Sequence, residues 1–121
     1  MILNLNKTNV GLLLLHMNIS RRNVSRGFKS KYLARKYKKY MKSYDEVLET
    51  LETAFESDKE HNILHFNIRE INMIEAFLNW YTMNLDDILR KANNKNEVDH
   101  RQLQELININ KQIKKLKAYA T

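Results

Sequence analysis

The sequence predicts an all-α protein, an antiparallel bundle of three long helices with a short N-terminal element. The 121-residue chain has no Pro and only two Gly, Gly11 and Gly27, so nothing interrupts a helix strongly after residue 27. Three long segments place apolar residues at alternating spacings of three and four, which is the pattern of packed amphipathic helices. Strands joined by tight turns would need the Gly, Pro or Asn-Gly signals that this chain lacks.

The first 29 residues form the predicted N-terminal element. Thr8 is a candidate N-cap for a short helix ending at Met17, and Ile2, Leu3 and Leu5 are candidates for a short strand. We assign residues 1–29 to a basic N-terminal segment and residues 30–121 to the helical bundle.

The three long helices are predicted over residues 30–57, 68–91 and 97–119. Asn67 followed by Glu70, and Asn96 followed by Asp99, have the chemistry of helix N-caps. A short polar turn at residues 92–95 makes the last two helices antiparallel neighbours, and residues 58–66 allow a short extended stretch. Six positions on the apolar stripes are expected to be deeply buried: Leu51, Ile74, Leu78, Leu85, Leu106 and Ile113.

Positive charge is concentrated in one segment of a chain whose formal net charge is +7. Between residues 21 and 42 there are ten basic residues and no acidic one, and the following segment is mostly acidic. Such a cluster, interleaved with aromatic residues, is the electrostatic footprint of a protein that binds a phosphate backbone. One alternative is that these cations meet an acidic protein surface. Another is a solvated lysine face with no specific partner, on a helix whose tyrosines belong to the core. The candidate nucleic-acid-binding residues are Arg21, Arg22, Asn23, Arg26, Lys29, Lys31, Arg35, Lys36, Lys38, Lys39 and Lys42.

Residues 13–26 resemble the core of a bacterial helix-turn-helix motif. Asn18, Ile19, Ser20, Val24 and Arg26 match its turn and the start of its recognition helix. The resemblance implies that Ser20 caps a recognition helix whose polar residues face the major groove. Leu14 departs from the pattern, because the motif has a small residue there, and Gly27 interrupts the recognition helix early.

The chemistry of an enzyme is missing from the sequence. There is no Cys, no Gly-rich phosphate loop and no nucleophile elbow. His61 and His65 have a spacing that suits a metal only on a helix, and they fall in a predicted connection. We therefore expect a protein that is not an enzyme and that uses no metal and no cofactor.

No segment predicts a membrane protein. The apolar run at residues 10–17 is shorter than the roughly 20 residues that a bilayer span requires. That run also lacks the flanks of a signal peptide, so we expect a cytoplasmic protein. Abundant Asn, Lys and Ile are typical of an AT-rich genome, such as that of a bacterium or phage.

The apolar residues exceed what one thin helical hairpin covers, so the sequence predicts a homodimer. Phe77, Trp80 and Tyr119 are the candidate interface residues, because Trp and other aromatics are enriched where proteins meet. The predicted function is a small basic regulatory or accessory protein, encoded by a phage or mobile element, that binds nucleic acid. The alternative is a helical interaction module that binds and modulates another protein.

Overall fold

The computed structural model describes residues 1–120, and it contains four long helices and a two-stranded sheet. The order along the chain is β1 (Ile2–Asn6), α1 (Lys7–Lys31), α2 (Ala34–Glu56), β2 (His61–His65), α3 (Ile68–Lys91) and α4 (Glu97–Ala120). The chain is mostly helical, as predicted. The prediction of three long helices was wrong, because the N-terminal segment forms a fourth helix as long as the others.

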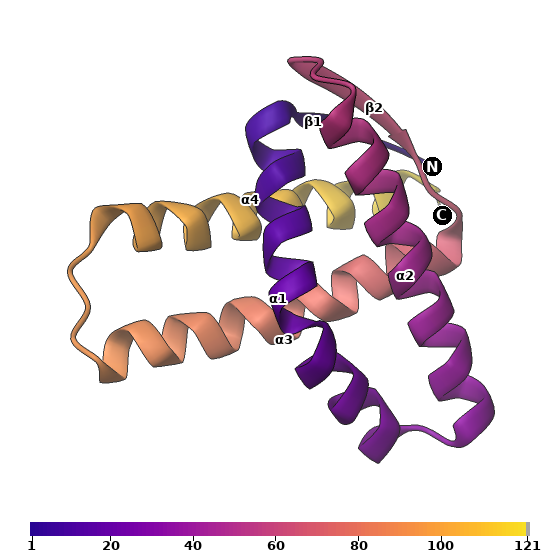
Figure 1. The fold of residues 1–121 in the computed structure, drawn as a ribbon, viewed down its shortest axis with the longest axis horizontal. Coiled ribbons are helices and arrows are strands. Elements are labelled where there is room, and N and C mark those ends of the chain that lie inside the picture. The colour runs from indigo at the N-terminus through magenta and orange to yellow at the C-terminus, as the bar shows by residue number, and fades with distance from the viewer. Residues whose placement is uncertain (121) are drawn as a thin grey trace.

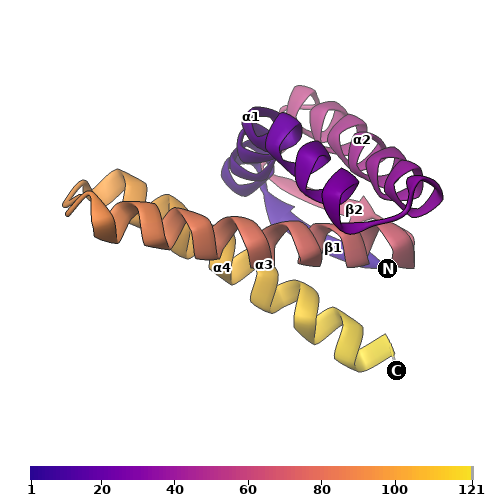
Figure 2. The same ribbon diagram turned by 90° about the horizontal axis from the view of Figure 1, so that it is seen from below.

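The helices form two hairpins that cross each other (Figure 1). Helices α1 and α2 form one hairpin, and α3 and α4 form the other. Figure 2 shows the first hairpin stacked on one side of α3, and the C-terminal half of α4 diverging from α3. The two connections between paired helices therefore lie at separate ends of the molecule.

Strands β1 and β2 pair antiparallel, with Leu3 opposite Leu64 and Ile2 opposite His65. In both strands buried and exposed residues alternate, so one face of this small sheet packs on the core. The whole α1–α2 hairpin separates the two strands in sequence. The candidate strand at Ile2, Leu3 and Leu5 and the extended stretch within residues 58–66 are thereby confirmed.

Local capping explains where the helices begin. In α3, the Asn67 side chain accepts a hydrogen bond from the Glu70 amide at 2.8 Å, and the Glu70 carboxylate accepts one from the Asn67 amide at 2.9 Å. Asn96 caps α4 through the amides of Val98 and Asp99. Both predicted caps are confirmed.

The predicted start of the N-terminal helix at Thr8 was wrong. Asn6 is the N-cap of α1, because its side chain accepts a hydrogen bond from the Asn9 amide at 2.8 Å. The same residue ends β1, so the chain passes from strand to helix without a loop.

One continuous core joins all four helices and the sheet. Leu13 and Met17 of α1 are fully buried together with Tyr44 of α2, Leu78 of α3 and Leu106 of α4. The boundary predicted at residues 29 and 30 falls inside α1, and both of its sides contribute to this core. The two predicted segments are therefore parts of one packed unit.

Five of the six predicted core positions are buried, and Leu85 is only half-buried. Near this point of α3 the apolar stripe shifts by one residue, because Leu89 is 5% exposed whereas Ile88 is 61% exposed. In Figure 1 this part of α3 pairs with α4 beyond the crossing with α1, so it packs on one neighbour instead of two.

Candidate nucleic-acid interface

The basic residues lie at the connected end of the α1–α2 hairpin. Only Tyr32 and Leu33 separate α1 from α2, so the C-terminal half of α1 and the N-terminal half of α2 lie side by side (Figure 1). A segment that is continuous in sequence therefore places its cations on both helices of one projecting end. The cluster could be predicted from the sequence, but the hairpin that presents it could not.

Two of the ten cations are engaged in ion pairs with α2 carboxylates. Arg21 donates two hydrogen bonds to Asp45, at 2.7 and 2.8 Å, and this carboxylate raises the pKa of Arg21. Lys42 lies 4.0 Å from Glu46. These two predicted binding residues are therefore the least available to an external phosphate.

The other eight cations are exposed, and none lies within ion-pair distance of a carboxylate in the described part of the chain. We call them the basic end: Arg22, Arg26, Lys29, Lys31, Arg35, Lys36, Lys38 and Lys39. Helix α2 begins here without a side-chain cap and with no acidic residue in its first turn, and the negative dipole end of α1 beside it partly offsets the positive end of α2. Repulsion among these eight cations lowers the folding stability unless a bound anion offsets it.

Three aromatic rings pack beneath these cations. Tyr32 and Tyr40 stack with centroids 4.8 Å apart, and Phe28 lies 5.2 Å from Tyr40. The Lys36 ammonium sits 4.9 Å from the centre of the Tyr32 ring, within the range of a cation–π contact. All three rings are half-buried, so they hold the end of the hairpin together and still present edges to solvent.

Three shallow hollows flank the basic end. The first lies between α1 and α2 and includes Arg22, Arg26 and Lys29; the second lies between α2 and α3 and includes Lys36, Lys39 and Arg69. The third lies between α1 and α3, and four of its ten lining residues are aromatic. Cations therefore border the hairpin on more than one side.

Sequence reasoning missed the contribution of α3 to this surface. Arg69 and Asn72 line the second hollow, and Trp80 lines the third. No local signal indicates this, because α3 reaches the basic end only through the crossing of the two hairpins. Asn23, which was grouped with the cations, lies in the aromatic hollow instead.

The expected helix-turn-helix is absent, and that expectation was wrong. Residues 7–31 form one uninterrupted helix, so no turn occurs at Asn18, Ile19 and Ser20. Ser20 is 5% exposed in the middle of α1 and cannot cap a recognition helix. Arg22 and Arg26 remain exposed, but they do so on the flank of a hairpin.

The three predicted interface residues do not form one surface. Phe77 is 1% exposed and packs in the core against Tyr44 and Tyr81, so it is not available to a partner. Trp80 is 42% exposed, and Tyr119 is 91% exposed near the end of α4. Of these three residues, Phe77 therefore belongs to the core, and Trp80 lines a hollow.

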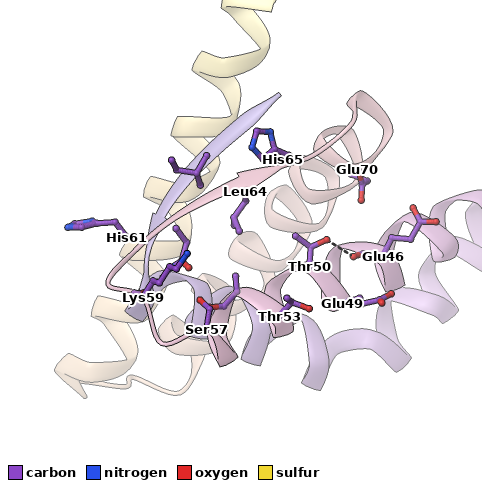
Figure 3. Close-up of a pocket in the computed structure, with 13 residues that line it drawn as sticks. Glu46, Glu49, Thr50, Thr53, Ser57, Lys59, His61, Leu64, His65 and Glu70 are labelled. Atoms are coloured by element: carbon purple, nitrogen blue, oxygen red, sulfur yellow. Dashed lines mark hydrogen bonds between the residues drawn. The ribbon is translucent and has the colours of Figure 1, made fainter.

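A separate open hollow lies between the C-terminal half of α2 and strand β2 (Figure 3). Its carboxylates, Glu46 and Glu49, lie on the α2 side, and its imidazoles, His61 and His65, lie on the β2 side. The figure shows that these groups do not converge on one point. Glu70 lies at its edge, with its carboxylate bonded in the α3 cap. Among residues 1–120, no group of three or more His, Asp or Glu is placed to hold a metal ion.

One buried polar contact joins the two hairpins. His16 of α1 lies between Tyr81 of α3 and Gln102 of α4, with its ring nitrogens 2.7 Å from the Tyr81 hydroxyl and 3.1 Å from the Gln102 amide oxygen. Because that oxygen only accepts, the His16 Nε2 donates to it and Nδ1 accepts from the Tyr81 hydroxyl. Desolvation lowers the pKa of His16, with partial opposition from the Gln102 bond.

Comparisons with protein-family models, curated proteins and solved structures gave no match. No helix within the described residues combines the length and apolar character that crossing a bilayer requires. The candidate interface therefore rests on the charges, contacts and hollows of this chain.

Proposed function

We propose that this protein is a nucleic-acid-binding regulatory or accessory protein whose basic end contacts the phosphate backbone. The observation that carries the proposal is the set of eight exposed cations, on two adjacent helices, that no carboxylate of the described chain neutralises. Phosphates spaced along a strand complement such an array, and binding releases the counterions that the strand would otherwise hold.

The aromatic rings beneath the cations also support this proposal. Tyr32, Tyr40 and Phe28 fix the end of the hairpin, so the cations stand on a packed base and not on a loop. Binding then requires little ordering of the backbone, and less binding free energy is lost to conformational entropy.

The test is the affinity for duplex DNA, single-stranded DNA and RNA, measured by fluorescence anisotropy at two salt concentrations. Affinity should fall with a log–log slope of about 0.7–0.9 per contacted phosphate. Changing Lys36, Lys38 and Lys39 together to Gln should weaken binding to all sequences alike and flatten that slope, because three backbone contacts are lost.

A matched control changes three exposed lysines of α4, Lys111, Lys114 and Lys115, to Gln. It lowers the net charge equally on another part of the molecule, and we expect it to keep most of the affinity. Equal losses in both variants would contradict a localised interface. Affinity for every nucleic acid weaker than about 10⁻⁴ M at low salt would favour the alternative, an interaction module for an acidic protein surface.

A further inference from the structure

The hollow between α1 and α3 differs in chemistry from the rest of the basic end. It encloses about 320 Å³ and is lined by Val24, Phe28, Tyr32, Ala76, Phe77 and Trp80, with Asn23, Ser30 and Lys31 among its polar groups. We call it the aromatic groove. Its apolar lining lies directly beside the cations of α1, so its surroundings are positive while its interior is not.

We infer that the aromatic groove accepts an unstacked nucleobase, so that the protein prefers single-stranded nucleic acid to duplex. This inference rests on the proposed function and specifies its ligand. A base presents a flat apolar face for stacking on aromatic side chains, and it is covalently joined to the phosphate that the neighbouring cations attract.

The groove has an accessible stacking surface and open space. Trp80 is 42% exposed, and its indole lies at the rim beyond the buried Phe77 ring. On the opposite wall, Gly27 has no atom within 4 Å of the position that a Cβ would occupy. A side chain at Gly27 would therefore meet open space, and Phe77 and Trp80 supply aromatic surface on the α3 side.

Polar groups at the edge of the groove match the edge of a base. The Asn23 side chain is exposed and makes no hydrogen bond within the described chain, so its amide group can both donate and accept. The Ser30 hydroxyl already donates to the Gly27 carbonyl at 3.0 Å and retains its acceptor capacity. A base seated on Trp80 would thus meet an unused amide beside it.

The same features argue against the other ligands of a basic surface. In a duplex the base faces are stacked on one another, and only an unpaired or extruded base exposes them. An acidic peptide would complement the cations, but its carboxylates gain nothing from an aromatic wall that offers few donors. The combination of apolar interior and basic surroundings fits a single strand best.

The chain carries its own reporter for this test, because Trp80 is its only tryptophan. We would titrate the intact protein with an oligothymidylate and an oligouridylate of about 12 nucleotides, a duplex of equal length, and an abasic strand of equal charge. We expect the strands with unpaired bases to quench the Trp80 fluorescence and to bind more tightly than the other two.

A pair of substitutions at Gly27 tests the groove without changing charge or removing a stacking residue. Gly27→Phe places a ring in the open space and should weaken oligothymidylate binding about tenfold, whereas Gly27→Ala should keep it. Trp80→Ala should weaken single-strand binding by a similar factor and leave the affinity for the abasic strand unchanged. Thermal unfolding of each variant serves as the control for correct folding.

The outcomes separate this inference from the proposed function. Suppose that the duplex and the abasic strand bind as tightly as oligothymidylate, with no effect of Gly27→Phe. That result would overturn the inference that the aromatic groove accepts a base, and it would leave the proposed backbone binding intact. No binding of any strand at low salt would overturn both. Strong single-strand binding that is weakened by Gly27→Phe and by Trp80→Ala, but not by Gly27→Ala, would support both.

Discussion

His16 is the residue whose environment most constrains how the molecule responds to pH. Its imidazole is 7% exposed and bonded to both α3 and α4, and burial lowers its pKa below the ordinary value of 6.5. Below pH 6.5 the unfolded chain therefore takes up a proton that the folded protein resists. Protonation thus favours the unfolded state.

We expect the free energy of unfolding to fall as the pH drops through the ordinary pKa of 6.5, and part of that fall should disappear in His16→Gln. Above the ordinary pKa, His16 is neutral in both states and contributes no pH dependence. Urea unfolding at several pH values measures this, with His65→Gln as the control, because that imidazole is exposed on β2. An identical pH dependence in His16→Gln and the wild type would contradict the prediction.

Leu78 gives the clearest test of the core. Its side chain is fully buried on α3, in the core that joins all four helices. Leu78→Ala should lower the free energy of unfolding by about 2–5 kcal/mol, because it loses buried apolar surface and leaves a cavity. Chemical denaturation measures the loss. Leu85→Ala, at a half-buried position of the same helix, should cost less, and equal losses would contradict the packing described.

The two glycines should respond differently to a methyl group. Gly27 lies inside α1 with open space around it, so Gly27→Ala should stabilise the protein by about 0.5–1 kcal/mol through helix propensity. At Gly11 a Cβ would lie 2.8 Å from Cε2 of Phe55, so that ring must move. We expect a smaller gain from Gly11→Ala, measured by thermal unfolding, and a larger one would contradict the close approach of α1 and α2.

At the scale of the element, helices α3 and α2 differ most in the capping of their N-termini. Helix α3 has a complete capping box, whereas the N-cap of α2, Leu33, makes no side-chain cap hydrogen bond and is 86% exposed. Leu33→Ser should therefore stabilise the protein by about 1 kcal/mol, and Asn67→Ala should destabilise it by about the same amount. Denaturation of both variants tests the pair, and a loss of stability in Leu33→Ser would count against the assigned start of α2.

The sequence predicted both ends of α3, because a capping pair marks its start and a polar turn follows its end. Only the part of α1 up to Met17 was predicted, as a short helix, and the rest was missed for a physical reason. Its inward positions Val10, Leu13, Met17 and Val24 follow the helical repeat, but Ser20 occupies the place between the last two. A buried polar residue at that place hid a stripe that continues through the helix and made its middle resemble a turn.

At the scale of the whole molecule, part of the candidate site could be predicted from the sequence and part could not. The basic end could be predicted because its residues are neighbours in sequence. The second and third hollows could not, since Arg69 and Trp80 reach them through the crossing of α3 with the first hairpin. Long-range packing, unlike local charge, leaves no periodic signal in one sequence.

The predicted homodimer remains a prediction, and the structure changes the surface that it would use. Helix α1 covers much of the apolar surplus on which the prediction rested, and Phe77 is buried. Met83, Ile88 and Val98 remain exposed on the α3–α4 hairpin. If the protein dimerises there, Ile88→Glu should convert it to a monomer in sedimentation velocity, whereas Tyr119→Glu should not. A monomeric wild type at high micromolar concentration would remove the prediction.

The strand pairing also has a consequence for the order of folding. Each helical hairpin closes between neighbouring segments, but β1 must wait for β2, and the amino group of Met1 bonds the carbonyl of Phe66 at 2.8 Å across 65 positions. Contacts between distant segments carry the larger loop-closure entropy and tend to slow folding. During synthesis, the first strand leaves the ribosome long before its partner exists. The edge of β1 that pairs with β2 therefore stays open to other chains until residues 61–65 emerge. We expect mispairing of the nascent protein in this interval.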